Sequence, residues 1–382
     1  IAVANKLSPR ETEIFILLAQ GRTRTLIQEE LVLAENTVKN YIDSSGIQVR
    51  RANEFDKKAL AVRIFSPDNL FELARYRREK GFIKTPSNGP YFIAVDIVKG
   101  GTGKTTTACE IALHLQLAGL RVLAIDLDAQ ANLTQYFGYE SDINYGEHTS
   151  YGLADEAVVG KTFAHVVSAY VNRPPQGSFG SLIKMPFGVN GPHLIPADAN
   201  LGDIEFALTS SKGSRELVLK RLFADSSKGL VPDLNVTDYD IIVMDCPPNV
   251  TMTSTAALAA SDIVVAPVRL DAFGVKGLTR LINEIEDLRH FAGEAIVADL
   301  AILPTHFASS FSRIQRMQQA LQQYHANMAP LAISLSEDFP RSLEHYIPLS
   351  LQKPLSNASK EYKEFTDFLL RKLISLEEQR AK

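Results

Sequence analysis

The stretch VKGGTGKTTT, residues 98–107, decides the fold that this chain can adopt. It follows the apolar run YFIAVDIV (91–98) and opens the helical pattern KTTTACEIALHLQLAG, which stops at Gly119. A strand, a glycine-rich turn and a helix in that order are the context of a Walker-type loop, where backbone N–H groups and the positive helix N-terminus hold phosphate. The pattern therefore predicts a nucleotide phosphate site and disfavours a glycine-rich turn without a ligand.

The residues of this loop have separate chemical roles. Lys104 is expected on the β- and γ-phosphates, and the Thr105 hydroxyl is expected to bind Mg²⁺. A strict Walker A motif has glycine at the position of Val98, and Lys99 is one cation more than the motif requires. The expected nucleotide contacts are Lys99, Gly100, Gly101, Thr102, Gly103, Lys104, Thr105 and Thr106.

Carboxylates end two later apolar runs. Asp126 and Asp128 end RVLAIDLD (121–128), and Asp245 ends DIIVMD (240–245). Ligands of open α/β sheets bind outside the carboxyl ends of the strands, so these side chains should face the phosphates. We expect Asp245 to hold Mg²⁺ mainly through water and Asp126 to orient the attacking water, while Asp128 suits a turn or cap as well as catalysis. The predicted metal ligands are Thr105, Asp126 and Asp245, and the predicted catalytic residues are Lys99, Lys104, Asp126 and Asp245.

Short apolar runs alternate with helical patterns from residue 91 onward. The expected buried strands are 91–98, 121–128, 193–197, 240–245, 262–268 and 297–305. Such alternation is typical of an α/β protein, here a P-loop NTPase with a mostly parallel sheet covered by helices. Pro304 and Thr305 end the last run and are candidate contacts of the adenine, and residues 139–192 should be an insertion of loops and short helices.

Three motifs resemble the ParA family of partition ATPases, which is grouped with MinD and the nitrogenase iron protein. They are the loop with Lys99 before two glycines, the segment DLDAQAN (126–132) and the strand end DCPP (245–248). The resemblance covers roughly residues 91–370, with Ala129 in place of the usual proline and Ile97-Val98 in place of a polar pair. It implies ATP/ADP and Mg²⁺ as ligands, and slow hydrolysis stimulated by a partner.

The resemblance also gives Lys99 a role. In this family the extra lysine reaches the phosphates of the partner subunit in a nucleotide-sandwich homodimer. Lys104 already serves the same subunit, so a second cation adds most across the interface, as an arginine finger does. The alternative is that Lys99 neutralises its own phosphate.

Composition and charge add a mild indication about the N-terminal segment. The net charge is −4, yet residues 1–90 carry 15 Lys and Arg against 11 Asp and Glu. A basic segment before an acidic remainder suggests an anion-binding module. The only two cysteines, Cys109 and Cys246, form no CxxC pair and no disulfide framework, which favours a reducing cytoplasm, and neither a signal peptide nor a membrane span is expected.

The segment Pro86–Pro90 is the clearest boundary signal, since prolines around a glycine suit neither helix nor strand. It predicts a DNA-binding domain at 1–85, a linker at 86–90 and an ATPase domain at 91–382. Residues 7–42 have the apolar spacing of a helix–turn–helix and resemble LuxR-type domains as far as residue 45. The context favours the winged helix–turn–helix of the larger, plasmid-type and RepA-like ParA proteins, with the wing and its exit within 50–70; a helical dimerisation domain is the alternative.

Basic and amide side chains of this module are candidates for DNA contact. Asn36, Lys39 and Asn40 would face a major groove, and the arginines of the segment would contact phosphates. Further cations near the C-terminus would serve the non-specific DNA binding that the family shows. The phosphate candidates are Arg22, Arg24, Arg50, Arg51, Arg313, Arg341 and Lys353.

The leading hypothesis is a DNA-segregation ATPase that dimerises on Mg-ATP, coats the nucleoid, meets a ParB-like centromere-binding protein and represses its own operon through the operator. A nucleotide-regulated repressor and a MinD-like membrane-positioning ATPase are the alternatives. The C-terminal pattern YKEFTDFLLRKLISLEEQRAK is amphipathic, but its polar side mixes acids with bases, so we expect it to pack on the domain instead of a membrane.

Overall fold

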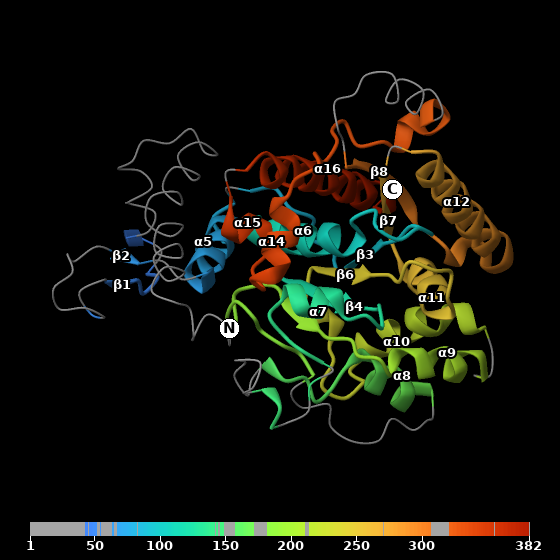
Figure 1. Ribbon diagram of the computed structural model, residues 1–382, viewed down its shortest axis with the longest axis horizontal. Helices are drawn as coiled ribbons and strands as arrows, with labels where there is room; N and C mark the ends of the chain where they lie inside the picture. Colours follow the sequence, from blue (N-terminus) through green and yellow to red (C-terminus); the bar gives the residue numbers. More distant parts are fainter. Residues whose placement is uncertain are drawn as a thin grey trace.

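This computed structural model describes residues 43–44, 46–51, 54, 63–64, 67–81, 83–141, 143, 146–148, 157–171, 182–210, 214–269, 271–306, 321–354 and 356–381. Its centre is a parallel six-stranded sheet in the order β5-β4-β6-β3-β7-β8 (Figure 1). The strands are β3 (Tyr91–Val95), β4 (Val122–Asp126), β5 (His193–Ile195), β6 (Ile241–Asp245), β7 (Ile263–Arg269) and β8 (Asp299–Thr305). All six predicted strands and the predicted parallel sheet are confirmed.

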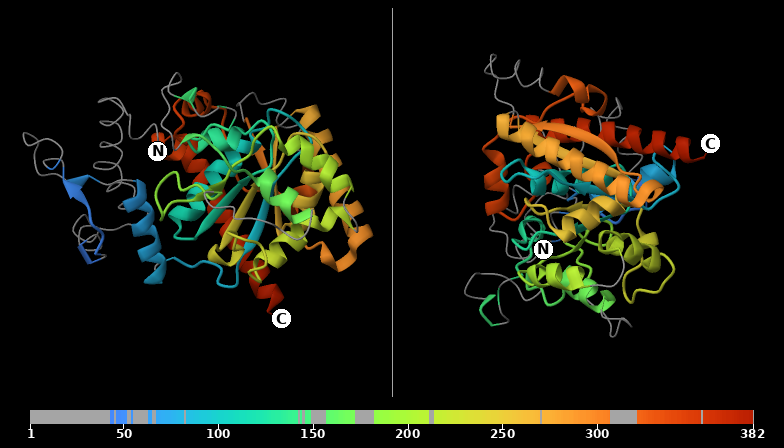
Figure 2. Two further views of the ribbon diagram at one scale, coloured as in Figure 1. Left: turned by 90° about the horizontal axis from the view of Figure 1, so that it is seen from below. Right: turned by 90° about the vertical axis from the view of Figure 1, so that its right-hand side faces the viewer.

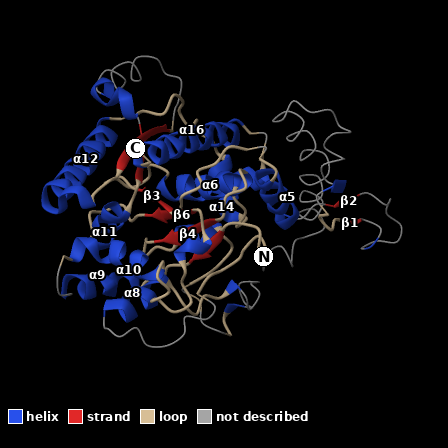
Figure 3. Cartoon of the chain, turned by 180° about the vertical axis from the view of Figure 1, so that it is seen from behind, coloured by secondary structure: helices blue, strands red, loops and turns tan. Residues whose placement is uncertain are grey.

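Side chains alternate along each strand, so the sheet buries both faces. Ile93 and Val95 point to one apolar core, and Ala94 between them points to the other. Strands buried on both sides read as continuous apolar runs, which is why IIVMD and IVVAPVR show no polar alternation. Helices form a layer on each face (Figures 2 and 3).

One layer consists of the helix after the glycine-rich loop and the C-terminal helix packed against it. Its elements are α5 (Pro67–Glu79), α6 (Lys104–Leu117), α7 (Asn132–Tyr136), α14 (Asp338–Glu344), α15 (Leu349–Gln352) and α16 (Asn357–Arg380). The apolar side of α16, with Phe365, Leu369 and Leu373, is buried. The prediction that this amphipathic helix packs on the domain is confirmed.

The other layer covers the opposite face of the sheet, where β3 contacts α11 and β7 contacts α12. Its helices are α8 (Phe163–Val171), α9 (Leu201–Ser210), α10 (Val218–Ser226), α11 (Met252–Ala260) and α12 (Ala272–Ala292). Short 3-10 turns are η5 (Arg215–Leu217), η6 (Val236–Asp238), η7 (Gly293–Ala295) and η8 (Gln322–Asn327). Among the described residues, no helix combines the length and apolar character needed to cross a bilayer.

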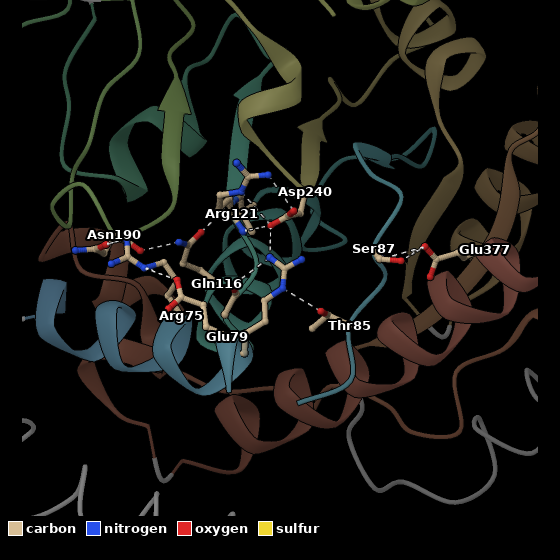
Figure 4. A network of polar contacts seen from close by, with 12 residues as sticks. Arg75, Glu79, Thr85, Ser87, Gln116, Arg121, Asn190, Asp240 and Glu377 are labelled. Atoms are coloured by element: carbon tan, nitrogen blue, oxygen red, sulfur yellow. Dashed lines mark hydrogen bonds and ion pairs between the residues drawn. The ribbon is translucent and has the colours of Figure 1, made fainter. Parts of the chain in front are cut away.

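Helix α5 is fixed to the amino-terminal end of the sheet, although it precedes the predicted linker. Phe71 is fully buried in the core shared with α6. A Cβ on Gly119 would lie 2.5 Å from the Ala74 carbonyl oxygen of α5. Asp240 accepts hydrogen bonds from Arg78 of α5 at 2.5 Å and from the backbone N–H of Arg121 at 2.7 Å (Figure 4). The predicted domain boundary at 86–90 stays a prediction. Helix α5 precedes this boundary in the sequence, yet it packs on α6, the helix that follows the glycine-rich loop.

A second small sheet precedes α5. Strand β1 (Arg50–Arg51) pairs antiparallel with β2 (Arg63–Ile64), with Arg51 opposite Arg63. This two-stranded ribbon lies within the stretch that we expected to form a wing. The predicted helix–turn–helix at 7–42 lies outside the described residues.

Candidate nucleotide-binding site

The glycine-rich loop leaves an open cradle at the N-terminus of α6. Gly101 and Gly103 have φ of 69° and 87°, in the left-handed region that glycine adopts without strain. Gly103 is the N-cap and supplies no side-chain acceptor for the first N–H groups of the helix. No described atom lies within 4 Å of a Cβ built on Gly100 or Gly101. Free N–H groups beside open space are what a bound phosphate requires.

Lys104 is folded back onto its own loop. Its side chain is buried, and its Nζ donates hydrogen bonds to the carbonyl oxygen of Lys99 at 2.8 Å and to that of Ile97 at 3.4 Å. These acceptors are neutral, so phosphate oxygens can replace them with stronger, charge-assisted bonds. The lysine therefore lies inside the loop that it is expected to serve.

Asp126 and Asp245 are brought together by the sheet. They are direct register partners on β4 and β6, and both are fully buried. Asp126 accepts hydrogen bonds from the Thr134 N–H at 2.9 Å, the Thr134 hydroxyl at 2.8 Å and the Asp128 N–H at 3.1 Å. Neither carboxylate oxygen of Asp245 has a hydrogen-bond partner among the described residues. Of the two predicted carboxylates, Asp126 is thus hydrogen-bonded by the protein, whereas Asp245 has no hydrogen-bond partner among the described residues.

Burial raises the pKa of both carboxyl groups. The pKa of Asp126 is raised because the group is desolvated, and the hydrogen bonds from Thr134 and Asp128 oppose the shift. The pKa of Asp245 is raised well above its usual range by desolvation and by the neighbouring Asp126; the nearby Thr105 hydroxyl opposes this without meeting hydrogen-bond geometry. A cation beside Asp245 would reverse this penalty, since an opposite charge favours the ionised form.

The donor set fits magnesium better than a metal held by the protein alone. Among the described residues, no three His, Cys, Asp or Glu side chains are grouped so that they could hold a metal ion. Mg²⁺ keeps several waters and binds through one or two carboxylates and the substrate phosphates, so it needs no such group. Asp245, unpartnered and close to Thr105, is the observation that fits it.

The two residues predicted to contact the adenine form hydrogen bonds with different parts of the chain, and Thr305 is the one that bonds to the glycine-rich loop. The Thr305 hydroxyl donates a hydrogen bond to the Thr102 carbonyl oxygen at 2.8 Å, and the Pro304 carbonyl oxygen accepts one from Ile333 at 2.8 Å. Asp128 accepts a hydrogen bond from the Gln130 N–H at 3.0 Å, which is the turn geometry that we expected as its alternative to catalysis.

Three further residues at this end of the sheet were missed by sequence reasoning. His306 follows β8 with φ of 53°, and its ring lies 3.8 Å from a Cβ built on Gly103. Asp96 follows β3, and burial, with Glu284 nearby, raises its pKa to about 8 against the opposing charge of Lys104. Phe273 of α12 lies under the Lys99 ammonium, with 4.9 Å between Nζ and the ring centroid. The signals for the first two were a polar residue directly after the run 297–305 and an acidic residue inside the run 91–98, whereas nothing in the sequence pairs Phe273 with Lys99.

The predicted DNA contacts divide into three groups. Arg22, Arg24, Asn36, Lys39, Asn40 and Arg313 lie outside the described residues. Arg50 and Arg51 lie on β1, and the register adds Arg63 opposite Arg51. Arg341 is exposed on α14. Lys353, which follows α15, forms an ion pair with Asp338 of α14, and both cations lower the pKa of Asp338.

The two predicted segments have separate relatives. The family model described as AAA domain matches residues 91–297, and the model described as bacterial regulatory proteins of the luxR family matches residues 5–45. The Soj sporulation initiation inhibitor protein of Bacillus subtilis is 27% identical over 272 residues, which is 71% of this chain and 94% of that protein. The chromosome partitioning protein ParA of Caulobacter vibrioides strain NA1000 is 30% identical over 197 residues, 52% of this chain and 62% of that protein.

Solved structures show the same fold. A plasmid partition protein from Borrelia burgdorferi superposes with a TM-score of 0.52 at 21% identity and covers 75% of this chain and 100% of its own. Cobyrinic acid a,c-diamide synthase from Mycobacterium smegmatis with bound ADP and magnesium gives a TM-score of 0.55 at 23% identity, covering 74% of this chain and 95% of its own. At these identities the likeness concerns the fold alone.

The fold and the loop define a P-loop ATPase domain. Because the AAA-domain match spans more than half of the chain, the chain belongs to that family. Its relatives and its N-terminal match place it among the ParA-type ATPases with an N-terminal helix–turn–helix, as the three motifs and the apolar spacing of residues 7–42 predicted.

Proposed function

We propose that this chain is a DNA partition ATPase that hydrolyses ATP slowly and acts as a nucleotide-dependent homodimer. The observation that carries the proposal is the unpartnered, fully buried carboxylate of Asp245 beside an open loop and the buried Lys104. A buried charge without a partner is expensive in a resting protein, so its retention indicates a ligand that completes it. The relative named for chromosome partitioning supports the choice of process.

Each residue of the site has a defined task in this proposal. Thr105 and Asp245 would hold magnesium, and Lys104 would leave the loop carbonyls for the β- and γ-phosphates. Magnesium, when bound, neutralises phosphate charge that builds up in the transition state. Asp126, held by Thr134 and the Asp128 N–H, keeps a fixed orientation toward the attacking water. Lys99 acts on the phosphates of the partner subunit.

The DNA contacts belong to two surfaces. The N-terminal segment binds the operator of its own partition genes, with Arg51 of the ribbon among the cations that contact phosphates. The ATP-bound dimer binds other DNA without sequence preference through cations that include Arg341, and a ParB-like protein stimulates hydrolysis and release. The match to luxR-type regulators supports the first surface.

ATP-dependent binding to non-operator DNA tests the proposal, with wild type compared with Lys99→Ala. We expect the variant to bind ATP as wild type does, to be monomeric at concentrations at which wild type dimerises, and to lose non-specific DNA binding there, because the cation acts across the dimer. Lys276→Ala is the matched control, since this exposed lysine lies on α12 outside the proposed site. Nucleotide binding is measured in parallel so that a collapsed loop is recognised.

The same experiment distinguishes the alternatives. If Lys99→Ala behaves like wild type and DNA footprinting shows protection of one operator only, the chain is a nucleotide-regulated repressor. The match to luxR-type regulators is consistent with that role as well. A MinD-like membrane role would need the apolar side of α16, which is instead packed against α6. Sedimentation with liposomes and ATP checks that point.

A further inference from the structure

Lys99 lies on an exposed aromatic ring. Its Nζ is 4.9 Å from the ring centroid of Phe273, within the range of a cation–π contact. Phe273 is 64% exposed, whereas most aromatic side chains of this fold are buried in the two cores. A single exposed phenylalanine is ordinary on a protein surface, so the observation that counts is the contact of its ring with the Lys99 ammonium.

The first turn of α12 offers Lys99 no carboxylate. The Asp271 carboxylate accepts a hydrogen bond from the Gly274 N–H at 2.7 Å and forms an ion pair with Arg269 at 3.3 Å. Lys99 forms no ion pair with any described residue, and its ammonium lies near the positive end of a helix, which repels it. The face of the Phe273 ring is therefore the group that holds this cation.

The backbone at Lys99 rests on the second turn of the same helix. A Cβ on Gly277 of α12 would lie 3.2 Å from the Val98 carbonyl oxygen and 3.4 Å from the Lys99 Cβ, so the loop rests against this glycine. On its other side the Lys99 carbonyl oxygen accepts the 2.8 Å hydrogen bond from Lys104. Movement of Lys104 to a phosphate would remove that bond and loosen the loop at Lys99.

We propose that Phe273 is a positioning residue that seats the Lys99 ammonium on α12 and must release it before Lys99 can act on a nucleotide. This rests on the proposed function for what Lys99 does afterwards, but not for the seat itself. An exposed cation–π contact contributes about 0.5–1 kcal/mol, so the seat holds Lys99 weakly and reversibly. A carboxylate there would hold the lysine more strongly and would repel the phosphates.

The seat is tested in the full chain without nucleotide or DNA. Reductive methylation with ¹³C labels the lysines, and Lys99→Arg identifies the Lys99 resonance by its loss. We expect an upfield ring-current shift of this resonance in wild type and in Phe273→Tyr. In Phe273→Leu the resonance should remain, but without the upfield shift. The control is Phe291→Leu, because Phe291 is 62% exposed at the other end of α12 and should leave the resonance unchanged. A Lys99 resonance that is the same in wild type and Phe273→Leu overturns the seat.

A double-mutant cycle tests the competition with nucleotide-dependent association. Phe273→Leu should lower the dissociation constant of the ATP-dependent dimer about five- to thirtyfold, because neither of the two seats, one in each subunit, has to be vacated any longer. The effect should vanish in a Lys99→Ala background, measured as residual ATP-dependent association or crosslinking. An equal effect in both backgrounds means that Phe273 acts through the interface and overturns the competition. A ring-current shift with no ATP response in any variant leaves the seat standing and refutes the proposed function instead.

Discussion

Asp240 and Asp245 lie at opposite ends of the same strand and have opposite surroundings. Asp240, just before β6, accepts hydrogen bonds from Arg78, from the Arg121 side chain and from the Arg121 N–H, and these hold its pKa below the usual range against the effect of burial. Asp245, the last residue of β6, has no partner among the described residues, and its pKa is raised. An aspartate thus has a structural role at one end of β6, where its carboxylate is fully hydrogen-bonded, whereas the aspartate at the other end lacks a hydrogen-bond partner within the described part of the chain.

This difference extends along both edges of the sheet. At the amino-terminal edge, Asp262 before β7 accepts hydrogen bonds from the Phe92 N–H at 2.7 Å and from Arg380 at 2.6 Å. At the carboxyl-terminal edge, the glycines open onto free space and the Lys99 ammonium rests on a neutral ring. A protein tolerates unsatisfied groups where a ligand completes them, and it compensates with satisfied ones elsewhere.

The largest expected effect comes from breaking the amino-terminal end. Asp240→Ala leaves Arg78 and the Arg121 N–H without their acceptor in a half-buried position, so the free energy of unfolding should fall by about 2–4 kcal/mol. Because the folded pKa of Asp240 is lowered, this stabilisation is present above the unfolded pKa and is lost as the pH falls through the folded pKa. Urea unfolding of wild type and variant at neutral and acidic pH measures both.

The control for this prediction is Asp238→Ala. Asp238 is exposed and accepts one hydrogen bond from Asn235 at 3.0 Å. Its loss should cost about 0.5 kcal/mol or less. Equal losses for the two variants, or a cost for Asp240→Ala that does not shrink in acid, would contradict the paired role of Asp240.

A smaller loss is expected when α5 is pushed off α6. Gly119→Ala combines a φ of 87° with a Cβ only 2.5 Å from the Ala74 carbonyl oxygen, so we expect about 2–3 kcal/mol of destabilisation. Gly229→Ala is a matched control, since its φ is 72° and no described atom lies within 4 Å of the new Cβ. The difference between their melting temperatures reports the packing of α5; no difference would mean that this contact is easily relaxed.

The smallest effect should have the opposite sign and occurs at the carboxyl-terminal end. Asp245→Asn removes an unpartnered buried acid, so the nucleotide-free chain should gain on the order of 1 kcal/mol at neutral pH while Mg²⁺-dependent hydrolysis is lost. Asp262→Asn, at a paired aspartate, should instead lower stability. Denaturant unfolding and phosphate release measure the two readouts; a shift of both variants in the same direction would remove the distinction between the two ends.

Much of the fold and of the phosphate site could be predicted because the signals are local. Apolar runs marked the strands, Gly119 marked the end of α6, and the position of Asp126 and Asp245 after their runs placed them at one edge. What could not be predicted depends on partners distant in sequence. Thr305 was a candidate for the adenine, yet its hydroxyl is bonded to Thr102 of the loop, 203 residues away.

The sequence by itself determined the parallel α/β architecture, the loop with its two lysines and the carboxylates that follow the strands. These follow from periodicity and from the geometry of a strand, a turn and a helix, which act over a few residues. Only the tertiary structure decided which aspartate is paired and which is left open, and that Lys99 lies on Phe273. Those outcomes depend on whether a donor, an acceptor or a ring from a remote segment reaches within a few ångströms, and packing of the whole chain sets that distance.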